Sequence, residues 1–473
     1  MASLHITRRS FLAGALSTTA AMIAPGLAWS RSSELLFPEG FLWGVAASAP
    51  ETESRLGRGR SNWDVFIDNI GGSADGTTNK FNVEFETRYM DDLKLLQQAG
   101  VKSFRFSFAW PRIQPETPGA PNAQAMGYYD RLMDAMLEHG IEPIPTLFHW
   151  DMPLWAGDFL DRDVARKMGD YAELMARLVG DRTKTWLLFN EPGVIPILGY
   201  GAGMFAPGYQ NLDYMGRALH HVNLAHAQAF KAVRANSSVG TKISSAFNMM
   251  YFDAPSGKQE DIDSTKLANV VWRDGTTMPA YGKGYPLILM PYVEKYIQPG
   301  DMEAIAIHPD FFGLNFYSRF FVKANPKAPL GHDIIEPPKD LERTQEMPYD
   351  PDTFYQVLMN TYKFYDEPEI IVTEFGFPLK DDAPSDGWVS DPKRIKFIKG
   401  YLESAHKAYQ DGVNLKGMIY WSATDNWEWT QGLDKRFGLI HVEHPSLKRI
   451  PKRSLEYFGR CIKMNGIARE PEL

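Results

Sequence analysis

Hydrophobic residues in this chain are concentrated in short runs, which alternate with longer segments of mixed hydrophobic and polar residues. Eight runs are rich in β-branched and aromatic residues, a pattern typical of buried parallel strands. They cover residues 41–48, 103–110, 142–150, 185–191, 243–251, 311–317, 369–375 and 417–423. The pattern therefore predicts eight strands that are buried on both faces.

Several of the segments between these runs have the spacing of amphipathic helices, with hydrophobic residues three or four positions apart. The predicted helices cover residues 89–99, 127–138, 163–179, 213–234, 352–364 and 393–410. Helices between successive strands predict a parallel sheet, and eight such repeats close into a barrel. We therefore predict an α/β fold with a single (β/α)8 TIM barrel. The proline- and charge-rich stretches 252–310 and 320–350 are interpreted as loop insertions that wall the site.

Composition limits the functions that such a barrel can have. The 473 residues are 44% hydrophobic and 23% charged, which is ordinary for a globular protein with a large core. The formal net charge of −8 argues against nucleic acid or an acidic membrane surface as a partner. The 12 Trp residues suit stacking on sugar rings as well as core packing. The single Cys461 cannot form an intrachain disulfide.

The first thirty residues have the features of a targeting segment. Residues 7–12 read TRRSFL, and an uncharged stretch follows from Phe11 to Ala28. The twin arginines and the small residues near Ala28 resemble a twin-arginine export signal, whereas Ser17–Thr19 and Pro25 make a stable membrane span a poor interpretation. We therefore predict a signal peptide at residues 1–30, a catalytic domain at residues 31–473, the twin-arginine export machinery as a partner, and a bacterial periplasmic or secreted location.

Two of the predicted strands end in a glutamate. The stretch TWLLFNEP at residues 185–192 delivers Glu191, and EIIVTEFG at residues 369–376 delivers Glu374. The carboxyl ends of barrel strands meet on one face, so the two side chains are expected to lie close together. A single glutamate after a strand is more often a helix cap or a salt-bridge partner. A pair is what glycosidic bond cleavage requires, because one carboxyl group must be protonated and the other ionised.

Further motifs occur at the other strand ends. They are FLWG (41–44), FRFS (104–107), WPRIQP (110–115), HWD (149–151), FNEP (189–192), GLNFY (313–317), TEFG (373–376) and DNWEW (425–429). With these motifs the sequence resembles the retaining β-glucosidases of glycoside hydrolase family 1, from about residue 37 to residue 450 or beyond. The resemblance implies an exo-acting retaining β-glycosidase, most simply a β-glucosidase, that acts on a small glycoside or oligosaccharide and needs neither a metal nor a cofactor.

The resemblance also implies a role for individual residues. Glu191 would be the acid/base and Glu374 the nucleophile, with carboxyl groups about 5 to 5.5 Å apart, so that a covalent glycosyl-enzyme forms and the anomeric configuration is retained. Substrate-binding roles fall on Glu51, His149, Trp150, Asn190, Trp421, Glu428 and Trp429. Arg105, Asn315 and Tyr317 would support the nucleophile.

The sequence departs from the family pattern at Glu51, where family members usually carry Gln. An ionised carboxylate accepts hydrogen bonds but cannot donate them. Compensation is expected from Arg58 or Arg60, from a protonated Glu51, or from a substrate that donates strongly, such as an amino sugar. Smaller departures are Gly193 in place of Trp and Phe375 in place of Asn, which suggest an altered rim or an altered environment around the site residues.

Alternative interpretations remain at this point. The same mechanism could act on a galactoside, a fucoside, a mannoside or an amino-sugar glycoside, and a transglycosylase would use the same residues. A sugar-binding protein with a decayed site is disfavoured because both Glu191 and Glu374 are present. Glu428 argues against a 6-phosphoglycosidase, in which Ser is usual at that position. His220, His221 and His226 lack the spacing of a metal site and are interpreted as packing or surface residues.

Overall fold

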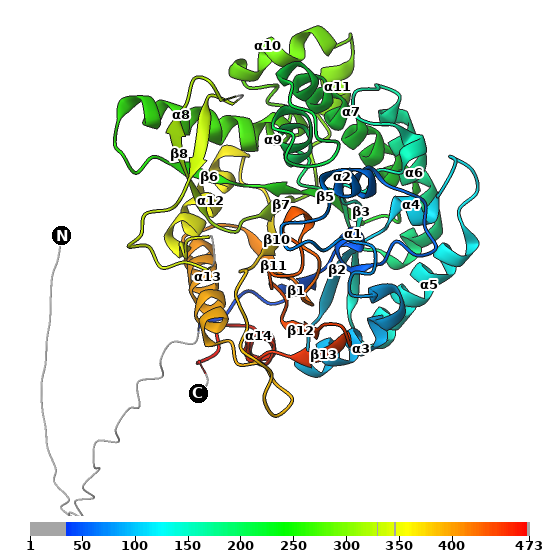
Figure 1. The fold of residues 1–473 in the computed structure, drawn as a ribbon, viewed down its shortest axis with the longest axis vertical. Coiled ribbons are helices and arrows are strands. Elements are labelled where there is room, and N and C mark those ends of the chain that lie inside the picture. The colour runs from blue at the N-terminus through cyan, green and yellow to red at the C-terminus, as the bar shows by residue number, and fades with distance from the viewer. Residues whose placement is uncertain (1–34, 329, 345–346, 471–473) are drawn as a thin grey trace, which may run out of the picture. The chain divides into compact units, whose positions relative to one another are not determined.

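The computed structural model describes residues 35–470, apart from residue 329 and residues 345–346 (Figure 1). The predicted twin-arginine signal peptide lies outside the described residues. Within the described part of the chain, none of the helices combines the length and the apolar character that crossing a membrane requires.

Eight parallel strands form a closed barrel in the order β1-β11-β10-β7-β5-β4-β3-β2. Their bounds are β1 Leu42–Ala46, β2 Ser103–Ser107, β3 Glu142–Phe148, β4 Thr185–Asn190, β5 Lys242–Asn248, β7 Phe312–Asn315, β10 Ile370–Phe375 and β11 Leu415–Trp421. The predicted (β/α)8 barrel is thereby confirmed, with each strand inside or within two residues of its predicted run.

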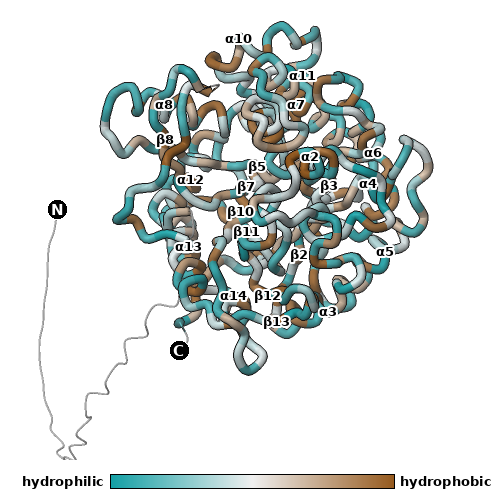
Figure 2. The backbone as a smooth tube through the Cα atoms, viewed as in Figure 1, coloured by the Kyte–Doolittle hydropathy of each residue, from teal (hydrophilic) through white to brown (hydrophobic). Residues whose placement is uncertain are grey.

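Helices surround the barrel and cover its strands (Figure 1). The six predicted helices are confirmed as α3 Phe85–Ala99, α5 Ala123–Glu138, α6 Val164–Val179, α7 Leu212–Asn236, α12 Pro351–Phe364 and α13 Pro392–Gln410. In α6, for example, the buried residues Val164, Met168, Tyr171, Met175 and Val179 recur every three or four positions. Figure 2 shows this alternation of hydrophobic and hydrophilic positions along the outer helices. One face of each helix therefore packs on the barrel.

The insertions are more structured than the sequence indicates. The segment 252–310 contains α8 Gln259–Asn269, η4 Val270–Asp274, α9 Gly275–Ala280, η5 Leu287–Leu289, α10 Met290–Val293, η6 Glu294–Tyr296 and α11 Asp301–Ile305. A small sheet joins β6 Tyr251–Asp253, β8 Arg319–Ala324 and β9 His332–Ile335. The predicted loop insertions thus contain short helices and strands that the sequence did not indicate, because short elements of this kind depend on tertiary packing and leave little periodicity in the sequence.

Smaller elements complete the fold. They are α1 Ala49–Thr52, α2 Asn62–Ile70, α4 Trp110–Ile113, η1 Leu154–Ala156, η2 Gly180–Arg182, η3 Ile195–Gly201, η7 Trp429–Gln431, α14 Arg453–Met464 and the hairpin of β12 Ile440–Glu443 and β13 Lys448–Pro451. Two of them, α1 with Glu51 and η7 with Trp429, follow the carboxyl ends of barrel strands and carry residues of the predicted site.

The inside of the barrel is filled by hydrophobic side chains. One buried cluster takes residues from six different strands: Ala46, Ile144, Leu187, Ala246, Ile371 and Ile419. Gly313 on β7 completes this packing, because a Cβ at that position would clash with the Ser245 carbonyl. The barrel is therefore a solid core, and the site can form only at its ends.

Candidate active site

A cavity of about 940 Å³ opens at the carboxyl ends of the barrel strands. Eleven of the twelve predicted site residues line it: Glu51, His149, Trp150, Asn190, Glu191, Asn315, Tyr317, Glu374, Trp421, Glu428 and Trp429. The twelfth, Arg105, lies buried directly behind Glu374. The structure thus brings together all the residues that the sequence indicates, from segments far apart in the chain.

Glu374, near the end of β10, is held by two hydrogen-bond donors. Arg105 Nη1 donates to Glu374 Oε1 at 2.5 Å, and the Tyr317 hydroxyl donates to Oε2. The guanidinium is fixed in turn by hydrogen bonds to the Thr373 carbonyl at 3.0 Å and to Thr146 Oγ1 at 3.1 Å. Since Arg105 is only 1% exposed, this ion pair is shielded from water, and it orients the carboxylate toward the cavity.

Glu191 lies in a contrasting environment. It follows β4 directly, and its backbone N–H donates to the Ala246 carbonyl at 2.7 Å. Asn315 Nδ2 donates to Glu191 Oε1 at 3.1 Å, but no cation pairs with this carboxyl group among the described ion pairs. Removal from solvent and the negative charge of Glu374 raise the pKa of Glu191 to about 8. The two carboxyl groups are therefore suited to opposite protonation states near neutral pH.

Asn190 connects the two glutamates to His149. Its Oδ1 accepts from Arg105 Nη2 at 2.7 Å and from Asn315 Nδ2 at 3.1 Å, so its amide group must donate to His149 Nε2 at 2.9 Å. The imidazole proton then resides on Nδ1, which has no protein partner. Burial and the charge of Arg105 lower the pKa of His149, so the ring is neutral. It offers an N–H donor for a ligand.

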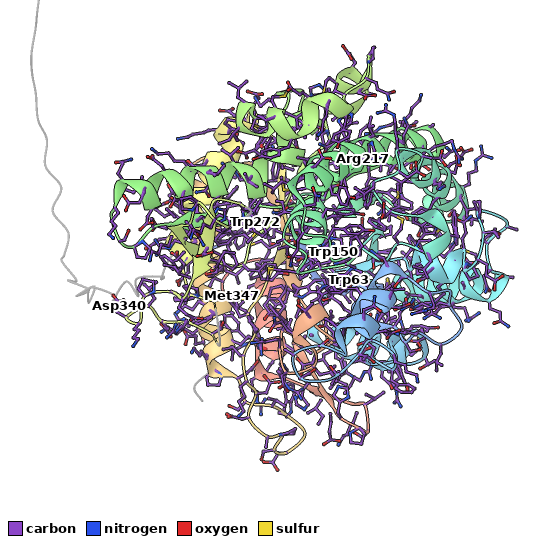
Figure 3. All side chains as sticks on the ribbon, turned by 45° about the horizontal axis from the view of Figure 1, so that its top comes forward. Trp63, Trp150, Arg217, Trp272, Asp340 and Met347 are labelled. Atoms are coloured by element: carbon purple, nitrogen blue, oxygen red, sulfur yellow. The ribbon has the colours of Figure 1, made fainter. Side chains whose placement is uncertain are left out.

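Tryptophan rings form much of the remaining surface. Trp150 and Trp429 lie with ring centroids 4.8 Å apart, and Trp421 stacks on His149 at 5.9 Å. Figure 3 shows Trp150 beside Trp63, which supports it from behind at 6.4 Å. Flat apolar faces beside hydrogen-bonding groups are suited to sugar rings, which have apolar C–H faces and polar edges.

Three site residues have positive φ angles, which residues other than glycine rarely adopt. The φ angles are 76° at Trp150, 42° at Glu191 and 45° at Trp429. Each costs on the order of 1 kcal/mol or more and persists only where surrounding contacts enforce it. For Trp150 that contact is a hydrogen bond from its indole Nε1 to the Asn190 carbonyl at 2.8 Å. The fold thus holds these side chains in position at a cost in stability.

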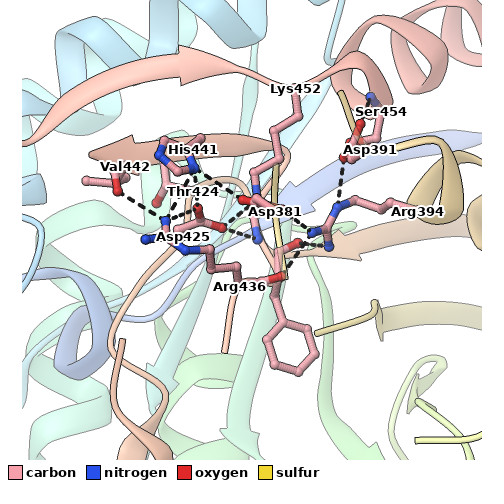
Figure 4. Close-up of polar contacts among 12 residues, drawn as sticks. Asp381, Asp391, Arg394, Thr424, Asp425, Arg436, His441, Val442, Lys452 and Ser454 are labelled. Atoms are coloured by element: carbon pink, nitrogen blue, oxygen red, sulfur yellow. Dashed lines mark hydrogen bonds and ion pairs between the residues drawn. The ribbon is translucent and has the colours of Figure 1, made fainter. Parts of the chain in front are cut away.

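The loop that carries Glu428 and Trp429 is anchored by a buried ion network (Figure 4). Asp425 Oδ1 accepts from Lys452 Nζ at 2.7 Å, and Oδ2 accepts from Arg436 Nη1 at 2.9 Å. Asp381, Asp425 and His441 lie close enough together to suggest a metal site. However, Lys452 Nζ is 2.7 Å from both aspartates, so an ammonium group already neutralises them. The network fixes the loop.

The expected cationic partners of Glu51 are engaged elsewhere. Arg58 binds Asp64 with contacts of 2.7 and 2.8 Å, and Arg60 lies 3.0 Å from Asp68. Compensation by Arg58 or Arg60 was therefore a wrong expectation. Instead, the Ser48 hydroxyl donates to Glu51 Oε2. The role of Ser48 was missed, although the spacing S-x-x-E at residues 48–51 is the signature of residues that interact across a helix start.

The wide part of the cavity is lined mostly by apolar side chains that the sequence did not indicate. They are Val194, Leu198, Ala202, Met204, Phe205, Met250, Trp272, Phe316, Phe320, Leu330, Ile334 and Met347. Many come from η3 and from the two insertions, so the expectation that the insertions wall the site is confirmed. At Gly193 a Cβ would lie 3.1 Å from Asn248 Oδ1 and 3.4 Å from the Trp272 carbonyl, which leaves little room for a larger residue.

The other residues singled out from the sequence have structural roles. Phe375 is fully buried and packs on Tyr420 with ring centroids 5.3 Å apart. The three histidines are buried in α7: His220 contacts Asp301 at 2.9 Å, His221 contacts the Phe159 carbonyl, and His226 contacts Ser245. Their interpretation as packing residues is confirmed.

A parallel barrel with two glutamates of contrasting environment in a tryptophan-lined cavity defines a barrel glycosidase. Comparison with known proteins makes the class specific, because the model of glycosyl hydrolase family 1 matches residues 33–467. The chain therefore belongs to glycosyl hydrolase family 1, and it is a glycosidase.

Relatives with known names agree with this assignment. β-Glucosidase A of Thermotoga maritima is 36% identical over 443 residues, which are 91% of this chain and 98% of that protein. A bifunctional β-D-glucosidase/β-D-fucosidase of Bifidobacterium breve is 34% identical over 460 residues, covering 90% and 98%. The solved structure of the family 1 β-glucosidase from Thermotoga maritima superimposes with a TM-score of 0.87 at 35% identity, covering 93% of this chain and 100% of that one.

Proposed function

We propose that this protein is an exo-acting retaining β-glucosidase, which hydrolyses terminal non-reducing β-D-glucosyl residues by double displacement. The observation that carries the proposal is the contrast between the two carboxyl groups. Glu374 accepts hydrogen bonds from Arg105 and Tyr317, whereas the pKa of Glu191 is raised to about 8. One group is equipped to attack as an anion and the other to deliver a proton.

In the first step Glu374 attacks the anomeric carbon, and Glu191 donates its proton to the departing oxygen. The product is a glycosyl ester of Glu374, and the negative charge that raised the pKa of Glu191 is consumed. Glu191, now ionised, takes a proton from water in the second step, while the water oxygen attacks the anomeric carbon and displaces the Glu374 carboxylate. Two displacements at one carbon retain its configuration.

The surrounding polar groups act on the glycone. His149 Nδ1–H is a free donor, and Asn190 lies between both glutamates, where a hydroxyl next to the anomeric carbon would reach it. Trp421 and Trp429 supply stacking surfaces. Arg105, Asn315 and Tyr317 keep the two catalytic carboxyl groups in place.

The apolar mouth of the cavity supports an aryl or alkyl aglycone over a second sugar. Met204 is 60% exposed and Ile334 is 49% exposed, so both present apolar surface to an incoming group. Trp272 and Phe320 add aromatic faces on the same wall. Polar side chains such as Gln210, Asn248 and Gln431 also line the cavity, but apolar side chains form most of its surface, which favours an apolar aglycone.

A panel of p-nitrophenyl β-glycosides tests the proposal. The glucoside should be hydrolysed by the wild type with retained configuration, as followed by NMR, and Glu374→Gln should abolish turnover. Preferred cleavage of the galactoside, fucoside, mannoside or glucosaminide would replace the glucosidase by another β-glycosidase. The B. breve relative, named for two activities, supports keeping the fucoside in the panel. Absence of turnover on every member would overturn the enzymatic proposal.

Export through the twin-arginine pathway is proposed separately, on the arginines at positions 8 and 9. Replacing both with Lys should leave the protein in the cytoplasm of a bacterial host, as measured by cell fractionation, while its glycosidase activity is unchanged. Periplasmic recovery of the double variant would contradict the proposal.

A further inference from the structure

The charged Asp, Glu, Lys and Arg side chains that line the cavity are all acidic among the described residues. Glu51, Glu191, Asp333, Glu374 and Glu428 line it, and no Lys or Arg does so in the part of the chain that the structure describes. The proposed mechanism uses two of these five carboxyl groups. A third, on Asp333, is exposed to solvent at the rim. The remaining two, Glu51 and Glu428, are called the acid pair below.

The acid pair has hydrogen-bonding capacity that the protein does not use. Glu51 is completely buried, and its Oε2 accepts from the Ser48 hydroxyl, but its Oε1 has no hydrogen-bond partner among residues 35–470 as far as the structure describes them. Glu428 Oε2 is also buried without a partner. Both carboxyl groups line the cavity, and the charge of Glu428 acts on Glu51. Buried polar atoms without partners at a cavity wall are costly unless a ligand satisfies them.

Among the described residues, no Lys or Arg forms an ion pair with either member of the acid pair. The nearby guanidinium groups are each held by another carboxylate: Arg105 by Glu374, Arg58 by Asp64 and Arg112 by Glu53. His149 Nε2 lies 3.8 Å from Glu51 Oε2, but it accepts a hydrogen bond from Asn190 and carries no proton.

The remaining groups that face the pair add to its negative charge. Glu374 acts on both members, and Glu191 acts on Glu51. Burial and these charges raise the pKa of Glu51 well above its usual range and that of Glu428 to about 8. Because the charge of Glu428 also raises the pKa of Glu51, ionisation of both carboxyl groups at once is disfavoured.

We propose that Glu51 and Glu428 share one proton and form the specificity-determining end of the glycone site, which accepts an ammonium group of an amino-deoxy sugar in place of that proton. A neutral sugar binds the singly protonated pair, whose O–H donates to a hydroxyl and whose free oxygens accept from it. An amino-deoxy sugar brings a positive charge and N–H donors to the same oxygens. The displaced proton passes to solvent, so the charge of the complex balances.

Proton release distinguishes the two kinds of ligand. Isothermal titration of the full-length enzyme at about pH 7, in buffers of different ionisation enthalpy, counts the protons released on binding. The probes are methyl C-β-glucoside, whose carbon–carbon glycosidic bond cannot be hydrolysed, and its four monoamino-deoxy analogues, with the amine at C2, C3, C4 or C6. At least one amino analogue should bind tenfold or more tightly than the parent and release about one proton, whereas the parent should release none. Equal affinity, or tight binding without proton release, would overturn the proposal.

Variants locate the effect. Glu51→Gln and Glu428→Gln should each abolish the proton release and the preference for the amine, while Asp333→Asn, which removes a rim carboxylate of the same cavity, should change neither. If the preference for the amine persisted in Glu51→Gln and disappeared in Asp333→Asn, it would be due to the general negative charge of the cavity and not to the acid pair. The inference rests on the proposed function only for the position of the glycone in the cavity. Because binding is measured without turnover, an enzyme that hydrolyses no glycoside could still bind as proposed, and the two failures are distinguishable.

Discussion

The protonation of Glu191 gives the most direct quantitative test of the proposed mechanism. With a pKa of about 8, the carboxyl group is about 90% protonated at pH 7, whereas a pKa of 4.5 would leave about 0.3% in the acid form. The environment therefore increases the amount of proton donor about 300-fold. Since the acid form is the active one, kcat/KM should fall as pH rises through about 8, and it should be about 100-fold lower at pH 10.

The identity of the leaving group distinguishes the titration of Glu191 from that of Glu428, whose pKa is also raised to about 8. Phenyl β-glucoside needs a proton on its departing oxygen, whereas 2,4-dinitrophenyl β-glucoside releases a far more acidic phenol and does not. The alkaline loss due to Glu191 should therefore appear only with the phenyl substrate, and Glu191→Gln should reduce that reaction by roughly 10²- to 10⁴-fold while sparing the first step with the dinitrophenyl substrate. Identical pH profiles for both substrates in the wild type would refute the assignment of Glu191 as the acid.

A trapped intermediate checks the cause of the raised pKa. A 2-deoxy-2-fluoro glucoside with a good leaving group should esterify Glu374 and stall, which removes the negative charge beside Glu191. The pKa of Glu191, followed by ¹³C NMR of labelled glutamate, should then fall, because the charge of Glu374 is one of the two main reasons for its elevation. An unchanged pKa would assign the whole elevation to burial.

Other consequences concern the supporting residues. Arg105→Met removes the cation bound to Glu374 and should lower kcat by at least 10²-fold with a smaller change in KM; equal effects on both would indicate a general loss of structure, which circular dichroism would reveal. Trp272→Ala should raise KM several-fold for aryl glucosides and leave it unchanged for methyl β-glucoside, and a uniform effect would contradict the apolar aglycone site. Lys452→Met should cost about 3–5 kcal/mol and lower Tm by about 4 °C, because Asp425 loses a buried partner, and adding Asp425→Asn should recover part of the loss in calorimetry.

The barrel and the meeting of Glu191 and Glu374 in one cavity could be predicted because each depends on a local pattern. The runs that became β4 and β10 are short and apolar and end at Glu191 and Glu374. Helices between the strands then fix the parallel topology, and the topology places strand ends on one face. This step requires no knowledge of distances between residues, because closure of the barrel brings the strand ends together.

Other features of the site depend on contacts that no local pattern records. Trp272 lies in a short helical segment whose position is set by its packing on Phe252, with ring centroids 5.8 Å apart. The positive φ of Glu191 follows from its hydrogen bond to Ala246 and from the hydrogen bonds around it, and a glutamate gives no sequence signal for that conformation. Likewise, Arg58 pairs with Asp64 and not with Glu51, and only the three-dimensional structure shows this.

The acid pair should also make the folded protein less stable at alkaline pH. In the folded state the pKa of Glu51 is raised above its unfolded value, so the folded protein binds more protons than the unfolded chain between the two values. Stability contributed by this group is therefore fully present below the unfolded pKa and is lost as pH rises through the folded one. Glu51→Gln carries no ionisable proton, so it should stabilise the enzyme relative to the wild type more at about pH 8.5 than at about pH 5, as measured by chemical denaturation. If the difference were the same at both pH values, Glu51 would be ionised throughout, and a cation or a donor outside the described contacts would have to compensate its charge.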